Sequence, residues 1–270
     1  MCGLRVHIVE WVGMTLLRKC GMLVRAVRTI RNWPTFLSEY VGITRGELCT
    51  IRLRGGTFFL LRAGTNDKVL FGQVWLARVY EPKGFEIKDS DTVIDIGAHI
   101  GFFTVRAARK ANRGRVYSFE PAPQNFEMLQ KNVSHNGLKN VTLINGAMSD
   151  RKEEKEFILY PESTGAHSFL YGPTDQKNII RVRTESLDGF FKTHALRSVD
   201  FLKMDCEGAE YEILFNTTSK ILQNVKKIAM EYHNRDDEHN VGALKRFLER
   251  QGFSVTVNRS GDNMLYALRP

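Results

Sequence analysis

From residue 91 onward, apolar strand-like segments alternate with helical segments, and this alternation limits what the chain can fold into. The strand-like segments are short and nearly continuous in apolar residues, and they cover 91–97, 115–120, 141–145, 199–205 and 226–233. The helical segments cover 102–111, 123–137, 207–216 and 241–252. Buried strands joined by such helices form βαβ units. We therefore predict an α/β fold with a mostly parallel sheet and helices on both faces.

The end of the chain departs from this alternation. Two strand-like segments, 253–258 and 263–269, are separated only by residues 259–262. A connection this short makes a hairpin, so one of these strands must run antiparallel to the other.

The first 85 residues follow a different pattern. Residues 49–63 read as a β-hairpin around Gly55-Gly56, a two-residue turn signal, and residues 67–80 read as a helix. We therefore predict an N-terminal extension over 1–48, a hairpin and helix over 49–85, and the main domain over 86–270.

The formal net charge is +9, and most of it lies near the N-terminus. Residues 1–70 hold 11 basic and 4 acidic residues, whereas residues 71–270 hold 28 and 26. Residues 9–31 are expected to form an amphipathic helix that Trp33-Pro34 ends, because a residue before proline disfavours helix. Its apolar stripe consists of Val9, Val12, Leu16, Cys20, Leu23, Val27 and Ile30, with Arg18, Arg25 and Arg28 on the other side.

Two interpretations of this helix are open. A basic amphipathic helix can lie on an anionic membrane surface, so we hypothesise peripheral membrane contact through residues 1–31. Apolar stripes more often pack on their own domain or on a second subunit, and we favour that interpretation. The oligomeric state stays open.

The cysteines and the hydropathy indicate a reducing compartment and no membrane span. Cys2, Cys20, Cys49 and Cys206 have neither the spacing of a zinc site nor that of a disulfide framework. No run of about 18 apolar residues predicts a membrane span, and the N-terminus makes a poor signal peptide. We predict a cytoplasmic protein without a bound metal, with a peripheral place at the inner membrane surface as an alternative.

In an open α/β sheet, ligands bind at the carboxyl ends of the strands, where the strand order reverses. After the first strand, the glycines of the loop from Asp95 through Gly97 to Gly101 let the backbone approach a ligand closely. Asp95 would attract a cation such as an ammonium. Glu120, after the second strand, is suited to accept hydrogen bonds from a ribose diol. Loop and acid together predict a nucleoside ligand; the alternative is that Glu120 caps the helix from Pro123.

Polar residues also follow the later strands. The turn 145–150 borders an adenine ring or is a simple loop. Asp205, Glu207 and Glu210 lie around the start of a helix after the fourth strand, and His233 follows the fifth. Acids favour helix N-termini, and a lone histidine is often structural. Their concentration at one edge of the sheet nevertheless predicts a site.

Five blocks together resemble one enzyme family. They are VIDIGAHIGFFT (93–104), FEP (119–121), NGAMSD (145–150), SLDGF (186–190) and FLKMDCEGAE (201–210). In this order they resemble the FkbM family of class I S-adenosylmethionine-dependent methyltransferases, and the resemblance covers residues 50–270. His99 stands where many relatives carry Asn.

The resemblance implies a Rossmann-like, seven-stranded sheet with an antiparallel last strand, S-adenosylmethionine as methyl donor, and O-methylation of polyketides, sugars or glycolipids. It places Asp95, Gly97, His99 and Gly101 at the amino acid moiety of the cofactor and Glu120 at the ribose. It places Ala147, with Asn145 or Asp150, at the adenine. The full set of expected cofactor-binding residues is Asp95, Gly97, Ala98, His99, Gly101, Glu120, Pro121, Asn145, Ala147, Asp150 and Asp205.

Methyl transfer to a hydroxyl needs alignment of three atoms and removal of one proton. The candidates for accepting this proton or orienting the acceptor are Asp205, Glu207 and His233. We hypothesise that His233 is the base, because an unperturbed imidazole is largely neutral at cytosolic pH. A metal ion bound by the carboxylate cluster is an open alternative. The acceptor pocket is expected to involve residues 155–184, which carry Tyr160, Ser163, His167, Ser168 and Tyr171; an exposed loop is the alternative.

Three other classes are open. A nicotinamide dehydrogenase would share the fold and Glu120 but needs a glycine pattern that this loop lacks. The overall charge suggests an RNA methyltransferase, yet residues 71–270 are nearly balanced, so nucleic acid is not the expected partner. A non-catalytic membrane-associated module with a nucleoside pocket would have no need of an intact carboxylate cluster.

Overall fold

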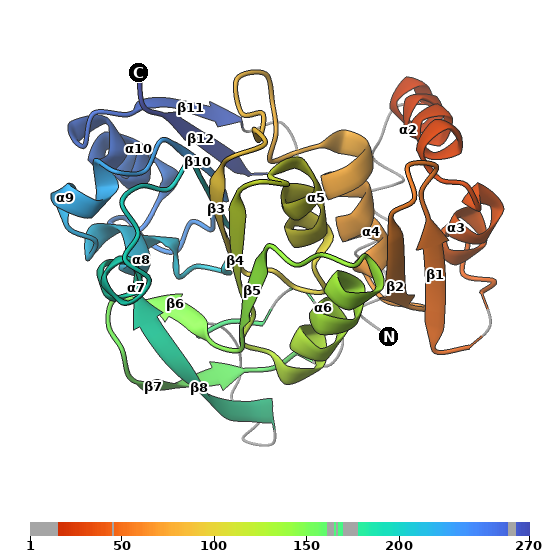
Figure 1. Cartoon of the computed structure of the whole chain (residues 1–270), viewed down its shortest axis with the longest axis horizontal. Coiled ribbons are helices and arrows are strands. Elements are labelled where there is room, and N and C mark those ends of the chain that lie inside the picture. The colour runs from red at the N-terminus through yellow and green to blue at the C-terminus, as the bar shows by residue number, and fades with distance from the viewer. Residues whose placement is uncertain (1–15, 45, 161–164, 166, 170–177, 259–262) are drawn as a thin grey trace.

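A central sheet of seven strands organises the protein. The computed structural model describes residues 16–44, 46–160, 165, 167–169, 178–258 and 263–270. The sheet has the order β11-β12-β10-β9-β3-β4-β5 (Figure 1). Its strands are β3 (Thr92–Ile96), β4 (Arg115–Phe119), β5 (Val141–Ile144), β9 (Phe201–Met204), β10 (Lys227–Glu231), β11 (Ser254–Asn258) and β12 (Met264–Leu268).

The direction of the strands agrees with the sequence analysis. The pairs of β3 with β4 and β9, of β4 with β5 and of β9 with β10 are parallel. β12 runs antiparallel to both β10 and β11, so the antiparallel last strand is confirmed. The strand order reverses between β3 and β9, which is where ligands bind in open α/β sheets.

Both faces of the sheet are buried, which explains why its strands read as continuous apolar runs. On one face, Val93 and Phe201 pack with α5 (Phe102–Lys110) and α6 (Pro123–His135). On the other face, Ile94 and Leu202 pack with a second group of helices. These are α7 (Leu187–Thr193), α8 (Glu210–Phe215), α9 (Ser219–Leu222) and α10 (Val241–Arg250).

A small second sheet follows β5. It has the order β6-β8-β7 and consists of β6 (Ala147–Ser149), β7 (Glu154–Ile158) and β8 (Ile179–Ser186). The strand-like segments read at 156–160 and 179–183 correspond to β7 and β8. The turn expected at 145–150 contains the short strand β6, which pairs in parallel with β8.

The N-terminal elements lie beside α5 and α6 (Figure 1). They are α2 (Leu16–Thr29), α3 (Trp33–Tyr40), β1 (Leu48–Arg52), β2 (Phe58–Arg62), α4 (Asp67–Phe71) and a π-helical segment, η1 (Gly72–Ala77). The hairpin read at 49–63 is present as the antiparallel pair of β1 and β2. The helix read at 67–80 is split into α4 and η1, and it ends where Arg78 adopts a left-handed φ of 59°.

The first helix differs from its expected form in two ways. α2 already ends at Thr29, and Trp33-Pro34 begins α3, because a proline needs no backbone N–H in the first turn of a helix. Ala26 and Ile30 are buried in the core, whereas Leu23, expected on the apolar stripe, is 43% exposed. The described part of α2 thus docks on its own domain, and the part of the expected stripe at residues 9–15 lies outside the described residues.

The N-terminal elements share one hydrophobic core with the sheet. Phe59 of β2 is fully buried, and its ring lies edge-to-face against Phe71, Trp75 and Phe102 at centroid distances of 5.9, 5.4 and 5.2 Å. Phe102 belongs to α5, so this aromatic cluster joins the hairpin to the main sheet. No helix within the described ranges combines the length and the hydropathy that crossing a bilayer would require.

This shared core predicts that the hairpin and the sheet unfold together. Phe59→Ala should lower the free energy of unfolding by about 3–5 kcal/mol, because it leaves a cavity among buried rings. Denaturant unfolding should show one transition at a lower midpoint. Val41→Ala, at a residue that is 68% exposed, is the control and should change stability by no more than about 0.5 kcal/mol. Two separate transitions would contradict a shared core.

Candidate functional site

A cavity opens at the carboxyl ends of β3, β4 and β9. Its empty space is about 910 Å³, with open solvent at its mouth included. Of the residues expected from the sequence to bind the cofactor or act in catalysis, it brings together Gly97, His99, Glu120, Pro121, Ala147, Asp205 and Glu207. Asp95, Ala98, Gly101, Asn145, Asp150 and His233 are not part of its lining.

The glycine loop is held against the loop that follows β9. Gly97 has a φ of +75°, and a Cβ atom there would lie 1.8 Å from the carbonyl oxygen of Asp205. Gly101 has a φ of +94°, and a Cβ atom there would meet Leu129 of α6 at 2.6 Å. Gly97 is therefore required both by a left-handed backbone and by the close approach of the Asp205 backbone, whereas at Gly101 the left-handed backbone is the reason for glycine, because the end of the Leu129 side chain can shift.

Asp95 makes contacts that the sequence did not predict. Its side chain is fully buried, and its carboxylate accepts a hydrogen bond from Thr104 at 2.6 Å and pairs with Lys203 Nζ at 3.2 Å. The expectation that Asp95 faces an ammonium group is not what this geometry favours, since a lysine already neutralises it. Lys203 was not singled out from the sequence, although a lysine within an apolar strand was a visible signal.

Glu120 meets the nucleoside expectation better. Its carboxylate accepts hydrogen bonds from the backbone N–H of His99 at 2.8 Å and of Ala122 at 2.9 Å. Asn125 Nδ2 donates to it at 3.4 Å. Burial raises the pKa of Glu120 to about 7. Because it lines the cavity, Glu120 can accept further hydrogen bonds from a ligand there, which goes beyond capping α6.

The turn after β5 contributes through Ala147 and the adjacent Met148, which line the cavity. Asn145 instead joins two strand ends, since its Nδ2 donates to the carbonyl oxygen of Glu120 at 2.9 Å. Asp150 forms ion pairs with Lys155 at 2.9 Å and with Arg151 at 3.3 Å. Asn145 and Asp150 were expected as alternatives beside the adenine. Both instead contact neighbouring loops.

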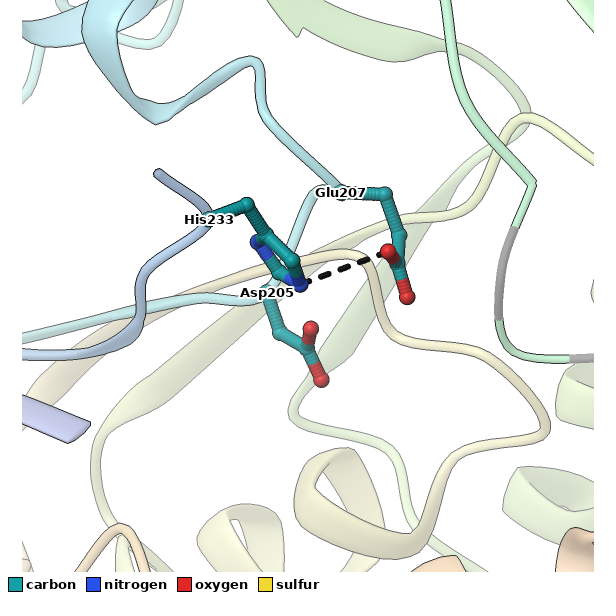
Figure 2. A group of neighbouring side chains, drawn as sticks. All are labelled: Asp205, Glu207 and His233. Carbon is teal, nitrogen blue, oxygen red and sulfur yellow. Dashed lines mark ion pairs between the residues drawn. The ribbon is translucent and has the colours of Figure 1, made fainter. Parts of the chain in front are cut away.

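The side chains of Asp205, Glu207 and His233 lie close together, as Figure 2 shows, and the first two line the cavity. His233 Nε2 lies 3.3 Å from Glu207 Oε2, and His233 Nδ1 lies 3.0 Å from Glu210 Oε1. Burial alone would lower the pKa of His233, but the hydrogen bond and charge of Glu210, together with Glu207, raise it to about 10. His233 is therefore an imidazolium at neutral pH, which reverses the reason for choosing it as a base.

The surroundings of Glu207 also shift its pKa. Its backbone has a left-handed φ of 51°, and the residue lines the cavity. Burial, followed by the charge of Asp205, raises the pKa of Glu207 to about 7. A carboxylate with a pKa near 7 is suited to accept a proton at physiological pH.

The same cluster could hold a cation. Asp205, Glu207 and His233 each offer one ligand atom, and these atoms lie within 4.8 Å of one another. Two carboxylates and an imidazole suit several divalent metals. The imidazolium state of His233 competes with this use, and the prediction of no bound metal stays a prediction.

Sequence reasoning missed the contribution of the N-terminal elements. Asn66, Leu70 and Gln73, from α4 and its surroundings, line the cavity. Tyr80 donates its hydroxyl to Asp205 Oδ2 at 2.8 Å. No local signal marks these residues, because they reach the site only when the hairpin docks on the sheet.

The segment between β7 and β8 also reaches the cavity. Gly165, His167 and Phe169 line it, and His167 Nδ1 accepts a hydrogen bond from the backbone of Tyr160 at 3.0 Å. Burial lowers the pKa of His167 to about 4, so this imidazole is neutral. Ser168 is buried and pairs through its backbone with Ile158. Ser163 and Tyr171 lie outside the described residues.

A glycine loop after β3, an acid after β4 and a cavity at the switch point define an α/β protein with a site for a nucleoside cofactor. The family model described as "Methyltransferase FkbM domain" matches residues 95–255. The chain belongs to the FkbM family and is an S-adenosylmethionine-dependent methyltransferase. The resemblance, the fold class and the cofactor read from the sequence are confirmed, and a nicotinamide dehydrogenase is excluded.

Curated relatives are distant in sequence. The "31-O-demethyl-FK506 methyltransferase FkbM" of Streptomyces tacrolimicus is 25% identical over 78% of this chain and 90% of its own. The "Hexuronic acid methyltransferase AglP" of Haloferax volcanii is 27% identical over 66% of this chain and 70% of its own. The "AMB antimetabolite synthetase AmbE" of Pseudomonas aeruginosa is 25% identical over 77% of this chain, but the match spans only 12% of that synthetase.

The pKa of Glu120 predicts a pH dependence of cofactor binding. A carboxylate that accepts hydrogen bonds from a ligand binds best when ionised, and a pKa of about 7 means that ionisation rises between pH 6 and 8. The Kd for S-adenosylhomocysteine should therefore be about tenfold weaker at pH 6 than at pH 8, measured by calorimetry. In Glu120→Gln, affinity should be lower at pH 8 and nearly flat with pH. A flat profile in the unmodified protein would contradict this assignment.

Proposed function

We propose that the protein is an O-methyltransferase that acts on a hydroxyl of a sugar, a glycolipid or another small metabolite. The observation that carries this proposal is the cluster of Asp205, Glu207 and His233 at the edge of the cavity that Glu120 also lines. Two relatives whose names specify demethyl-FK506 and a hexuronic acid support a small-molecule or sugar acceptor.

The lining residues suggest how the cofactor lies. Glu120 would accept hydrogen bonds from the ribose hydroxyls, and the backbone of the loop at Gly97 and His99 would approach the amino acid moiety. Ala147 and Met148 would border the adenine. Asp205, not Asp95, is the acid near the glycine loop that lines the cavity and would face the ammonium group.

In this proposal each residue of the cluster has a separate role in methyl transfer. S-adenosylmethionine supplies a methyl group on a sulfonium leaving group. Glu207 would accept the hydroxyl proton of the acceptor at its carboxylate, since burial holds its pKa near 7. His233, protonated between Glu207 and Glu210, would orient the Glu207 carboxylate through the 3.3 Å contact. Tyr80 keeps Asp205 in place.

The charged residues that line the cavity are acidic. Glu120, Asp205, Glu207 and Glu231 line it, and no lysine or arginine does so in the part of the chain that the structure describes. A phosphate-bearing polymer would meet carboxylates there. Together with the near balance of charge over 71–270, this supports a small-molecule or sugar acceptor over RNA, which is our second candidate.

Transfer of labelled methyl from S-adenosylmethionine to fractionated cell extracts tests the proposal. Label should enter a glycan, lipid or small-molecule fraction and stay base-stable, as an ether does. Glu207→Gln should lower kcat by roughly 10²–10⁴-fold with little change in the Kd for S-adenosylhomocysteine, because a positioned base is lost. His233→Gln should have a smaller effect.

Results of the same assay can contradict each part of the proposal. Label in RNA would favour the second candidate, and full activity of Glu207→Gln would remove the assigned base. Loss of activity after exhaustive chelation, restored by one divalent metal, would overturn the prediction that no metal is bound.

We also propose that the protein makes peripheral contact with a membrane through α2. Leu23 and Val24 are 43% and 49% exposed, and Arg25 and Arg28 are exposed beside them. Apolar side chains flanked by arginines favour an anionic bilayer surface. Flotation with vesicles rich in anionic lipid should recover the protein, and Leu23→Glu should reduce recovery at least about twofold, since one added charge opposes roughly 1 kcal/mol of attraction.

The matched control is Val41→Glu, which adds the same charge at an exposed apolar residue after α3. It should float like the unmodified protein. Equal flotation of all three proteins, or none of any, would contradict membrane contact through α2.

A further inference from the structure

The last residue of the N-terminal hairpin, Arg62, contacts three side chains at once. Its backbone N–H and Nε donate to Asp67 Oδ2 at 2.9 and 3.0 Å, and Nη2 pairs with Asp67 Oδ1 at 2.9 Å. Nη1 donates to Asn125 Oδ1 at 2.8 Å, and Nη2 lies 3.0 Å from His99 Nε2. A planar guanidinium held by a buried carboxylate is a rigid template for its other two partners.

Those two partners are the residues that hold Glu120. Asn125 Nδ2 donates to Glu120 Oε1 at 3.4 Å, and the backbone N–H of His99 donates to Glu120 Oε2 at 2.8 Å. Arg62 is not part of the cavity lining, but Asn125 and His99 are. Both oxygens of the Glu120 carboxylate are thus reached from Arg62 through one intervening residue.

The chemistry of arginine also sets how these partners present their atoms. A guanidinium donates hydrogen bonds and cannot accept them, and Asp67 Oδ1 lies farther from His99 Nε2, at 3.5 Å. We therefore assign His99 Nε2 as the acceptor, with the proton of the neutral ring on Nδ1. Burial lowers the pKa of His99 to about 4, which agrees with a neutral ring. In Asn125, the oxygen faces Arg62, which turns the amide nitrogen toward Glu120.

We propose that Arg62 is a positioning residue for the cofactor: it fixes the ring of His99 in one tautomer and the amide orientation of Asn125. By holding these two residues, it fixes the backbone N–H and the amide group that donate to the carboxylate of Glu120. The N-terminal hairpin is then part of the cofactor site in addition to packing on the sheet. This inference rests on the proposed contact between Glu120 and the ribose.

The full-length variants Arg62→Lys and Arg62→Gln test it. A lysine keeps the charge beside Asp67 but cannot hold His99 and Asn125 together, and a glutamine loses the charge as well. We expect the Kd for S-adenosylhomocysteine to rise roughly tenfold or more in both, the size of effect that loss of a buried charged hydrogen bond produces. ¹⁵N shifts of labelled histidine should show that His99 no longer has a single Nδ1–H tautomer.

Arg25→Gln is the matched control. Arg25 Nη1 donates to the carbonyl oxygen of Leu76, so this arginine also ties an N-terminal helix to its neighbours, but it does not contact Glu120, His99 or Asn125. It should change the Kd for S-adenosylhomocysteine less than about twofold, at a temperature well below the unfolding midpoint of every variant, and leave the His99 signals unchanged.

Two outcomes separate this inference from the proposed site. If Glu120→Ala loses affinity while folded Arg62→Lys keeps the Kd within about twofold and the His99 tautomer unchanged, the role of Arg62 is overturned and the ribose contact stands. If Glu120→Ala itself binds S-adenosylhomocysteine like the unmodified protein, the ribose contact fails first. Should Arg62→Gln not fold, Arg62→Lys alone decides.

Discussion

A buried ion pair joins the two central strands of the sheet at the point where the strand order reverses. Lys203 of β9 pairs with Asp95 of β3 at 3.2 Å, and both side chains are almost fully buried. Lys203 Nζ also donates to the carbonyl oxygen of Gly97 at 2.6 Å, so the same ammonium holds the glycine loop. Loss of either partner would leave a buried charge, which typically costs about 3–5 kcal/mol. The position of the loop, and of the cavity beside it, depends on this pair.

The cavity is assembled from both parts of the chain. Gly97 lies so close to the carbonyl oxygen of Asp205 that the loops after β3 and β9 form one wall. Tyr80 and Arg62, both N-terminal to the parallel sheet, reach Asp205 and His99. Because the hairpin shares its aromatic core with α5, packing of the N-terminal elements and the shape of the cofactor site are coupled.

Electrostatics within the cavity differ from what single residues suggest. An isolated histidine is mostly neutral at pH 7, but His233 lies between two carboxylates and is protonated. An isolated carboxylate is ionised at that pH, yet burial holds the pKa of Glu120 and of Glu207 near 7. Because neighbours and burial outweigh intrinsic acidity, our proposal makes Glu207 the base and His233 the orienting group.

Local patterns in the sequence were enough to establish the α/β class, the terminal antiparallel strand, the hairpin and the loops where a site should lie. Periodicity and turn chemistry act over a few residues, and motifs such as 201–210 keep their order along the chain. Those patterns could not show that Asp95 faces Lys203 and not the cavity, that Asp150 pairs with Lys155, or that Arg62 reaches the residues around Glu120. These are contacts between segments far apart in the chain, or rotamers selected by packing, and only the folded arrangement of sheet, hairpin and helices decides them.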